Sequence, residues 1–370
     1  MSESIPVRVG FQQRVLPSYR VPFFDALAEI CPNGLGVFAG KPRKDEALDT
    51  GARPMVADLT QGKNIHILEG LFYMCWQSGI MDWLERWKPD VLIMEANPRY
   101  VLSRNAARWM KSRGGKVIGW GLGSPRPAGH FSWLRLVLRR RFVSRFDAIV
   151  TYSQLGAQEY ARLGFPHGLV FTAPNAVAPK PKHQLPGRDA QYRSGRPVIL
   201  FVGRLQARKR VAALIRACSL LPPIFQPFLR IVGDGPLHRE LENLAEEIHP
   251  DTHFYGAQYS TDLEKHFREA DLFVQPGTGG LAVQQAMSFG LPVIVGVSDG
   301  TQSDLVRGEN GWILPDASPE TLASYIETAL SDIRQLRIMG RASYRIVSEE
   351  INLENMVDAF RRAVLKVLEG

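Results

Sequence analysis

A glycine-rich stretch, Gln275 to Val295, contains the residue types best suited to bind a phosphate group. Its glycines, Gly277, Gly279 and Gly280, leave the backbone open between a short apolar strand and a helix predicted to begin at Leu281. The free N–H groups at a helix start, together with the helix dipole, favour a bound anion. A tight turn without a ligand is the alternative, because a glycine cluster alone has low specificity. The stretch predicts one of these two structures.

Two cations occur at a comparable place earlier in the chain. The predicted strand Val198 to Val202 is followed by Gly203, and Arg204 and Lys209 lie in the turn that leads to the next helix. An arginine grips phosphate oxygens as a bidentate fork and a lysine acts as a point charge, so the pair suits a diphosphate. Ordinary surface charge is the alternative for either residue alone.

Polar side chains also follow two predicted strands of the first half. Arg14 and Arg20 fall in a polar loop expected after the strand Pro6 to Val9, and Glu95 and Asn97 follow a later apolar strand. Open α/β sheets bind ligands beyond the carboxyl ends of their strands. A carboxylate there can accept a proton or a sugar hydroxyl. Solvated loop residues are the alternative.

Positive charge is concentrated between residues 101 and 150, which contain eleven Lys or Arg and one acidic residue, while the formal net charge of the chain is +8. Such a patch attracts an anionic partner. Motifs that read or stack nucleic-acid bases are missing from the sequence, so we do not expect nucleic acid to be that partner.

A predicted helix within this window, residues 131–146, has two different sides. The side expected to pack on the domain contains Trp133, Leu136, Val137 and Val143. The side expected to contact an anionic membrane surface contains Phe131, Arg135, Leu138, Arg139, Phe142 and Arg145. Apolar side chains rimmed by arginine suit the interface of an anionic bilayer. A buried helix with solvated arginines is the alternative.

Composition and length limit the possible classes of protein. A chain of 370 residues exceeds one ordinary core, so two domains are expected. Three widely spaced cysteines, Cys31, Cys75 and Cys218, argue against a disulfide framework or a zinc site and favour a reducing cytoplasm. The sequence has no basic-then-apolar leader and no apolar run of about 18 residues, so we expect neither export by that route nor a membrane span.

Apolar strands and amphipathic helices alternate on both sides of a proline- and charge-rich segment. This alternation predicts two α/β domains with mainly parallel sheets and a cleft between them. The expected boundaries are 1–178 for the first domain, 179–196 for a linker, 197–350 for the second domain and 351–370 for a C-terminal helix.

Five segments of the second half occur in a recognisable order, namely VGRLQARK, VGDGPL, ADLFVQPG, QQAMSFGLPVIV and GENGWILP. Over Pro197 to about Leu330 they resemble the C-terminal domain of retaining family-4 glycosyltransferases of the GT-B fold, of the bacterial polysaccharide type. The first half is similar more loosely, through YSQLGAQEYARLG and APNAV. The resemblance implies two Rossmann-like parallel-sheet domains facing a cleft. It also implies that the C-terminal helix crosses back to the first domain; a terminal surface helix is the alternative.

The resemblance also implies roles for individual residues. In the family, the Arg and Lys that match Arg204 and Lys209 hold the donor diphosphate and stabilise the leaving group, which makes them the expected catalytic residues. The expected donor-binding residues are Gly203, Gly277, Thr278, Gly279, Gly280, Leu281 and Gln285. The family normally acts without metal, so we expect no metal ligands and no cofactor beyond the nucleotide-sugar substrate.

The chain departs from the family pattern at three places. The family usually has a Glu, seven residues and a second Glu, where this sequence has Gly277 and Gln285. A Gln can still bond a ribose hydroxyl, but Gly277 has no side chain for the donor sugar, and Thr278 substitutes for it only in part. Many members also have a His after the strand that matches Lys116 to Trp120, where this chain has Gly121-Leu122-Gly123.

The sequence therefore predicts a retaining, metal-independent glycosyltransferase. Its donor is a nucleotide sugar, bound by the second domain, and its acceptor is a membrane-anchored glycan such as a polyprenyl-diphosphate-linked one, bound by the first domain through Arg14, Arg20, Glu95 and Asn97. We expect it to act in surface polysaccharide biosynthesis, in the cytoplasm, on the inner face of the cytoplasmic membrane. The alternative is a catalytically inactive glycosyltransferase-like protein that binds a nucleotide sugar or a glycan.

Overall fold

The computed structural model describes residues 3–43, 46, 50–68, 70, 73–124, 132–193, 195–277, 281–296 and 302–369. The chain folds into two units. The first contains Met1–Val177 together with Leu353–Gly370, and the second contains Ala178–Asn352. Each unit is built on a parallel sheet with helices on both faces, which confirms the predicted α/β fold class.

The first unit is built on a seven-stranded parallel sheet in the order β3-β2-β1-β6-β7-β8-β9. The strands are β1 Val9–Val15, β2 Leu35–Gly40, β3 Asp58–Gln61, β6 Val91–Glu95, β7 Lys116–Gly121, β8 Ala148–Thr151 and β9 Val170–Thr172. An antiparallel hairpin stands beside the sheet, formed by β4 Lys63–Ile67 and β5 Met74–Ser78. Because the chain moves outward from β1 to β3 and then returns to β6, the direction of winding changes between β1 and β6.

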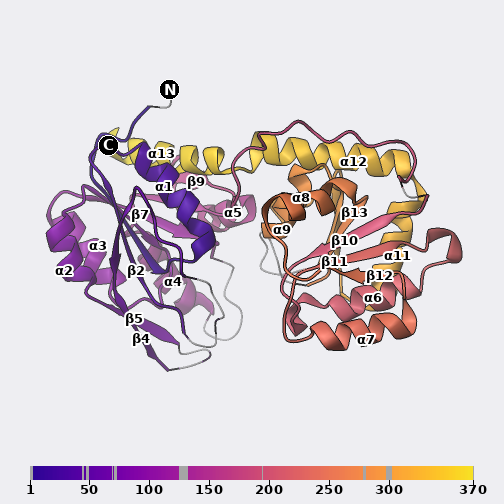
Figure 1. The fold of residues 1–370 in the computed structure, drawn as a ribbon. Helices are drawn as coiled ribbons and strands as arrows, with labels where there is room; N and C mark the ends of the chain where they lie inside the picture. Colours follow the sequence, from indigo (N-terminus) through magenta and orange to yellow (C-terminus); the bar gives the residue numbers. More distant parts are fainter. Residues whose placement is uncertain are drawn as a thin grey trace. The chain divides into compact units, whose positions relative to one another are not determined.

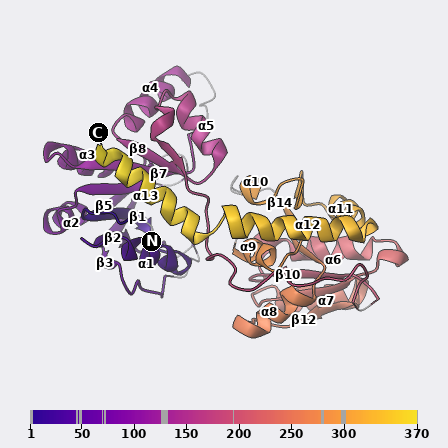
Figure 2. The ribbon, with the colours of Figure 1, turned by 90° about the horizontal axis from the view of Figure 1, so that it is seen from above.

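Helices cover both faces of this sheet (Figures 1 and 2). They are α1 Val21–Glu29, α2 Ile80–Trp87, α3 Ser103–Ser112, α4 Ser132–Val143, α5 Gln154–Arg162 and α13 Leu353–Glu369, with short 3-10 turns at Ser18–Arg20 and His167–Leu169. Helix α13 lies along α1 and over strands β7 to β9. The last helix of the chain is therefore part of the first unit.

Strand β1 begins at Val9 rather than ending there, which corrects the predicted strand Pro6 to Val9 and the predicted loop after it. β1 is a buried strand although it contains polar residues, and these residues form hydrogen bonds inside the first unit. Gln12 Nε2 donates to Gln77 Oε1 at 2.6 Å, and Gln77 Nε2 donates to the Gln13 carbonyl at 2.7 Å. Both glutamines of β1 are buried; the pairing satisfies the side chains of Gln12 and Gln77, whereas Gln13 Oε1 has no hydrogen-bond partner among the described residues. Arg14 is consequently a strand residue.

Aromatic rings hold α13 against the sheet of the first unit. Phe360 of α13 is fully buried, and its ring centroid lies 5.0 Å from that of Phe23, 5.3 Å from that of Trp120 and 5.6 Å from that of Phe11. Edge-to-face and tilted rings at such distances add to the free energy gained by burying apolar area. This cluster joins the first strand, the first helix and the last helix of the chain.

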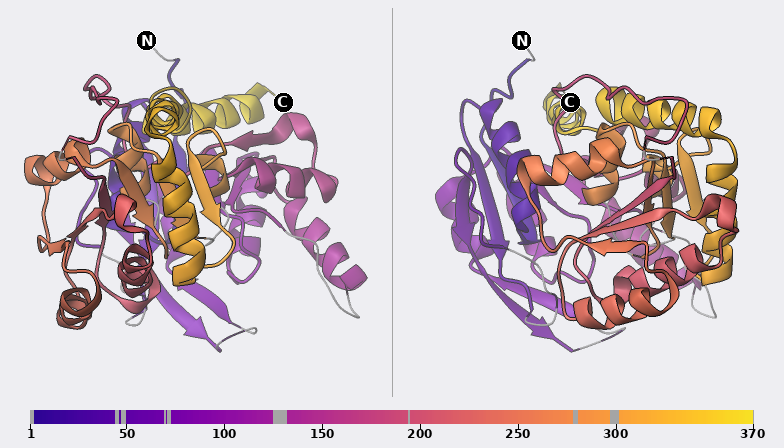
Figure 3. Two further views of the ribbon diagram at one scale, coloured as in Figure 1. Left: turned by 90° about the vertical axis from the view of Figure 1, so that its right-hand side faces the viewer. Right: turned by 45° about the vertical axis from the view of Figure 1, so that its right-hand side comes forward.

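The second unit has a six-stranded parallel sheet in the order β12-β11-β10-β13-β14-β15. The strands are β10 Val198–Val202, β11 Phe228–Val232, β12 Thr252–Phe254, β13 Leu272–Gln275, β14 Val293–Gly296 and β15 Gly311–Leu314. The helices are α6 Val211–Ser219, α7 His238–Ile248, α8 Ser260–Glu269, α9 Leu281–Ser288, α10 Gln302–Leu305, α11 Pro319–Ser331 and α12 Ile333–Arg345, followed by a π-helical turn at Ile346–Glu350, with 3-10 turns at Ala207–Lys209 and Pro223–Phe225. Figures 1 and 3 show α6 and α7 on one face of the sheet and α8 and α9 on the other.

The segment 179–196, predicted to be a linker, runs along the second unit. Arg188 reaches carbonyl oxygens of two packed segments: its Nη2 donates to Phe267 at 2.9 Å and to Phe289 at 3.2 Å, and its Nη1 donates to Ala270. Tyr192 also donates to the Leu330 carbonyl at 3.2 Å. This proline-rich segment is thus held against the second unit by hydrogen bonds.

Replacing Phe360 with Ala should destabilise the first unit by about 3–5 kcal/mol, the usual range for removing a buried phenylalanine. The change opens a cavity among the rings of three separate segments. Urea unfolding followed by tryptophan fluorescence measures it, with Leu368→Ala as the control, since Leu368 is on the same helix and 37% exposed. A loss for Phe360→Ala no larger than the control's would contradict the assigned role of this ring.

Candidate functional site

The carboxyl edge of the second sheet changes its direction of winding between β10 and β13. β10 pairs with β11 on one side and with β13 on the other, so the loops after β10 and β13 diverge. Ligands of open α/β sheets bind at such a switch point. The loops that leave this point contain Gly203 to Arg210 and Pro276 with Gly277, which include the residues predicted to bind a diphosphate.

Glycines allow these loops to pack backbone against backbone. A Cβ atom on Gly277 would lie 2.1 Å from the Arg208 carbonyl oxygen and 2.6 Å from Lys209 Cα, closer than real Cβ atoms approach. A Cβ atom on Gly233, after β11, would lie 2.0 Å from the Gly203 carbonyl oxygen. Only glycine fits at either place without moving the backbone. The loop after β10 is therefore fixed against the end of β13.

Lys209 lies over the start of its own loop. Its Cε atom is 3.7 Å from the position that a Cβ atom on Gly203 would occupy, and its side chain is half-buried. Burial and the neighbouring positive charge of Arg208 lower the pKa of Lys209 to about 8. A diphosphate at this place would favour the charged form of the lysine.

Arg204 is exposed and forms no ion pair within the described ranges. Its guanidinium is thus available to a ligand at the same edge as Lys209. Of the other predicted donor residues, Leu281 is the first residue of α9 and 45% exposed, and Gln285 is half-buried one turn further on. Thr278, Gly279 and Gly280 lie outside the described residues.

The predicted acceptor residues of the first unit fall at its own switch point, between β1 and β6. Arg14 is the penultimate residue of β1 and forms an ion pair with Glu46, with Nη2 2.9 Å from Oε1. Glu95 is the last residue of β6, and burial raises the pKa of its carboxyl group against the opposing effects of a hydrogen bond with Tyr100 and the charge of Arg14. The side chain of Asn97 accepts a bond from the Arg99 N–H at 3.1 Å. Three of the four residues thus gather at the end of two adjacent strands.

Arg20 differs from the other three because it is an interior residue, 4% exposed. Its guanidinium lies over the rings of Trp120 and Tyr152, with Cζ 5.2 Å and 5.6 Å from their centroids, and donates to Asn175 Oδ1 and to Met356 Sδ. Cation–π contacts compensate a buried guanidinium in place of a carboxylate. This placement corrects the predicted acceptor role of Arg20, since its side chain is committed inside the first unit.

Helix α4 packs in a different way from the prediction. Phe142, expected to contact a membrane, is 9% exposed and belongs to the core with Val143, and Arg145 lies over its ring at 5.5 Å. Trp133 and Val137, expected to pack, are 65% and 52% exposed. The reason is that the last turn of α4 docks on the core while its earlier turns project outward. Phe131 lies outside the described residues.

The exposed surface of α4 still combines apolar and basic side chains. The exposed apolar residues are Trp133, Leu134, Val137 and Leu138, and the exposed arginines are Arg135, Arg140 and Arg141, with Arg139 half-buried. The neighbouring α3 adds Arg104 and Arg108, whose charges, after burial and together with that of Arg141, lower the pKa of Arg145. No described helix is both long and apolar enough for a bilayer crossing.

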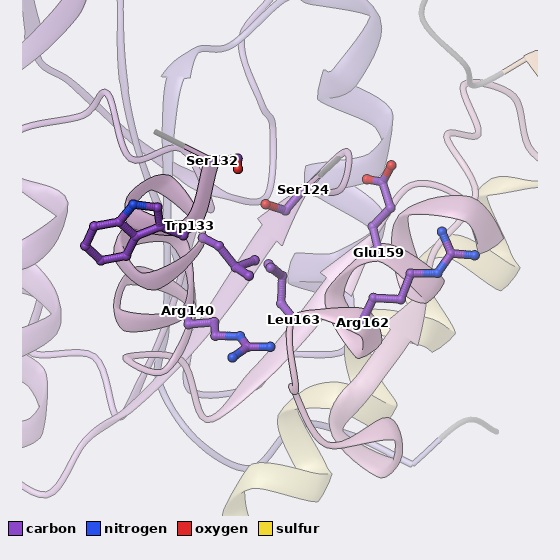
Figure 4. Close-up of a pocket in the computed structure, with 8 residues that line it drawn as sticks. Ser124, Ser132, Trp133, Arg140, Glu159, Arg162 and Leu163 are labelled. Carbon is purple, nitrogen blue, oxygen red and sulfur yellow. The ribbon is translucent and has the colours of Figure 1, made fainter. Parts of the chain in front are cut away.

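A cavity of about 520 Å³ lies between α4 and α5 (Figure 4). Its lining residues are Ser124, Ser132, Trp133, Leu136, Arg140, Glu159, Arg162 and Leu163. Figure 4 shows Trp133 and Arg140 of α4 across from Glu159 and Arg162 of α5. The sequence did not lead us to predict Glu159 and Arg162 as functional residues, although residues three apart on a helix share a face. Arginines beside apolar side chains suit an amphiphilic anion.

No cluster of three or more His, Cys, Asp or Glu side chains that could hold a metal ion occurs in the described part of the chain.

Several known proteins are similar to parts of this chain. Residues 188–346 match the family model of glycosyl transferases group 1. The chain is 27% identical over 255 residues to a GDP-mannose-dependent alpha-(1-6)-phosphatidylinositol monomannoside mannosyltransferase of Mycolicibacterium smegmatis, covering 64% of each chain. It is 30% identical over 138 residues to the putative colanic acid biosynthesis glycosyltransferase WcaL of Salmonella typhimurium, covering 34% of each. The matched segments span less than two thirds of these two relatives.

Solved structures are similar over almost the whole chain. Anabaena HepE in complex with UDP has a TM-score of 0.64 at 15% identity, covering 97% of this chain and 99% of that one. Sucrose-phosphate synthase from Thermosynechococcus elongatus has a TM-score of 0.64 at 18% identity, covering 98% and 99%. Residues 188–346 are thus similar to glycosyl transferases group 1, and the chain has the GT-B fold.

Proposed function

We propose that this protein is a retaining glycosyltransferase that moves a sugar from a nucleotide sugar to a membrane-anchored glycan in surface polysaccharide biosynthesis. The second unit binds the donor and the first unit binds the acceptor, a polyprenyl-diphosphate-linked glycan or a related lipid-linked one. Transfer needs no metal. The protein works in the cytoplasm, on the inner face of the cytoplasmic membrane.

The observation that carries this proposal is the packing of the Lys209 backbone against Gly277 at the switch point of the second sheet, in a loop that also contains the exposed Arg204. When the bond between the anomeric carbon and the diphosphate breaks, negative charge develops on the departing phosphate. Fixed cations at that place stabilise the charge more in the transition state than in the ground state. The acceptor hydroxyl then attacks the same face of the sugar, and its proton passes to the departing phosphate.

The relatives support the donor and acceptor classes. HepE is described in complex with UDP, and the Mycolicibacterium enzyme is named as GDP-mannose-dependent, so both names point to nucleotide donors. The latter acts on a phosphatidylinositol monomannoside, and WcaL is assigned to colanic acid biosynthesis. A lipid-linked glycan acceptor for the present chain agrees with both.

The first unit supports an acceptor at a membrane surface. Its α4 offers exposed Trp133, Val137 and Leu138 beside exposed arginines, and such a helix binds the interface of an anionic bilayer through both apolar burial and charge. The cavity between α4 and α5 contains Arg140 and Arg162 beside leucines, which suits the diphosphate and first isoprene units of a lipid carrier.

The second candidate function is that of a catalytically inactive protein that binds nucleotide sugars or glycans. The crowding around Gly277 favours it, because no carboxylate can occupy the position from which the family usually contacts the donor sugar. Such a protein would bind the nucleotide through the same cations but would release no product.

Arg204→Ala and Lys209→Ala should each lower turnover about 100-fold or more, the usual loss when one stabilising donor is removed from a charged transition state. The assay follows nucleoside diphosphate release from UDP- and GDP-sugars with a synthetic polyprenyl-diphosphate-linked monosaccharide in detergent. The anomeric configuration of the product is read by NMR.

Arg216→Ala is the matched control, since Arg216 is an exposed cation of α6 just beyond the same loop. Unchanged turnover in both site variants would refute the catalytic assignment. Nucleotide binding without any turnover in the wild-type protein would favour the inactive binding protein.

Nucleotide affinity should depend on pH through Lys209. Its pKa of about 8 in the free protein is below the ordinary lysine value, so the side chain loses its charge as pH rises through 8, and a bound diphosphate restores it. Binding of UDP or GDP should weaken roughly tenfold from pH 7 to pH 9, with proton uptake on binding. Isothermal titration calorimetry in buffers of different ionisation enthalpy measures both. Lys209→Arg should remove the dependence; a flat profile in the wild-type protein would contradict the role of Lys209.

Exposed residues of α4 should govern membrane binding. The wild-type protein should float with phosphatidylglycerol vesicles and not with phosphatidylcholine vesicles, and the double change Val137→Ser with Leu138→Ser should abolish flotation. Ile224→Ser, at an 81% exposed apolar residue of the second unit, is the control. High salt should weaken binding because the arginines contribute charge. Failure of the wild-type protein to bind anionic vesicles would refute the membrane proposal.

A further inference from the structure

The loops at the donor edge have an unusual charge distribution. Residues 203–210 contain four cations, Arg204, Arg208, Lys209 and Arg210, and neither this segment nor residues 275–285 contain an Asp or Glu. A site lined by one sign of charge selects ligands of the opposite sign. The resemblance assigns a diphosphate to two of the four cations, which leaves the others to be explained.

The structure excludes an acidic side chain from position 277, where the family usually has a Glu. At Gly277, a Cβ atom would meet the Arg208 carbonyl oxygen at 2.1 Å, Lys209 Cα at 2.6 Å and Lys209 carbonyl carbon at 2.7 Å. All three atoms belong to the backbone and cannot rotate away. A neutral sugar therefore finds no carboxylate at this position to accept bonds from its hydroxyls.

Arg208 is a cation of this segment to which the resemblance assigns no role. It is exposed and forms no ion pair among the residues that the structure describes. With the Gln206 amide turned so that its oxygen faces the guanidinium, Nε and Nη2 of Arg208 donate to that oxygen at 2.8 Å and 3.0 Å. A neutral amide orients the guanidinium without cancelling its charge. The influence of Arg208 on Lys209 indicates that this charge acts on the same edge.

Two acidic residues that follow strands of the second sheet have other partners. Asp316, after β15, accepts hydrogen bonds from Ser318 and Thr321, and it senses the charge of Arg210. Asp234, after β11, accepts a bond from the Gly235 N–H and pairs with His238. Arg210 thus has a carboxylate within electrostatic reach, whereas Arg208 is the third positive charge of the edge, beside Arg204 and Lys209.

We propose that the donor sugar itself carries a carboxylate, as in a uronic acid, and that Arg208 recognises it. This inference rests on the proposed function, since it concerns the sugar of the same donor. A nucleoside diphosphate joined to a neutral sugar brings two negative charges, which Arg204 and Lys209 balance. A uronate brings a third, and a guanidinium binds a carboxylate with two parallel hydrogen bonds. Arg208 is a specificity-determining residue in this assignment.

Matched donor pairs test the assignment, because their members differ only in the oxidation of C6. The pairs are UDP-glucose with UDP-glucuronic acid, and GDP-mannose with GDP-mannuronic acid, and calorimetry measures their dissociation constants. In the wild-type protein, one pair should favour the uronate by about tenfold, which corresponds to about 1.4 kcal/mol for one charge-assisted interaction. The preference should diminish at high salt.

Arg208→Gln should bring this ratio close to one, and Arg208→Lys should retain part of it. A general weakening of nucleotide binding cancels in the ratio because both members share the same diphosphate. Arg216→Gln, at an exposed arginine of α6, should leave the ratio unchanged. Far-UV circular dichroism confirms that the variants are folded.

Two results would overturn the inference while the proposed function stands: equal or tighter binding of the neutral hexose, or a uronate preference that persists in Arg208→Gln. Absence of binding by every nucleotide and nucleotide sugar would instead overturn the proposed function, and the inference with it.

Discussion

The donor edge of this protein depends on one contact, the packing of the Gly277 backbone against the backbone of Arg208 and Lys209. Because no side chain separates the two loops, the segment after β10 is fixed across the end of β13, and its cations have a defined place at the switch point of the sheet. The same contact excludes a carboxylate from position 277. One steric contact therefore positions the cations of the loop after β10 and also excludes a carboxylate at position 277. Together these two effects make the site positively charged.

The first unit has a different kind of organisation, in which some polar and charged side chains are buried and contact one another or aromatic rings. Gln12 and Gln77 bond inside the fold, and Arg20 is enclosed by aromatic rings without a carboxylate. Buried hydrogen-bond networks of this kind rigidify the structure around them. They fix the ends of β1 and β6, and thereby the surroundings of Glu95, whose raised pKa is typical of carboxyl groups with a functional role.

The sequence predicted the regular parts of the fold well, because buried parallel strands are uniformly apolar. β10 begins and ends where the predicted strand Val198 to Val202 does. β1 was misplaced because its interior is polar, and the hairpin β4–β5 was missed because its exposed side chains resemble a loop. Arg204 and Lys209 belong to the loop that packs against Gly277, and their joint action on a diphosphate stays a prediction. The contact that forbids a side chain at Gly277 and the exposed turns of α4 depend on three-dimensional packing that a linear pattern does not encode.

The path of the chain through the first unit has a consequence for biosynthesis. Arg20 bonds to Asn175, close to where the chain leaves this unit, and to Met356, close to where it returns, and Phe360 completes the aromatic core. Contacts between the N-terminal segments of the first unit and α13 form late, since the ribosome delivers α13 after the whole second unit. The second unit is continuous in sequence, so it can fold before α13 has packed on the sheet of the first unit. A nascent first unit therefore exposes an aromatic surface until α13 has been synthesised, and termination of translation before α13 would affect the unit made first.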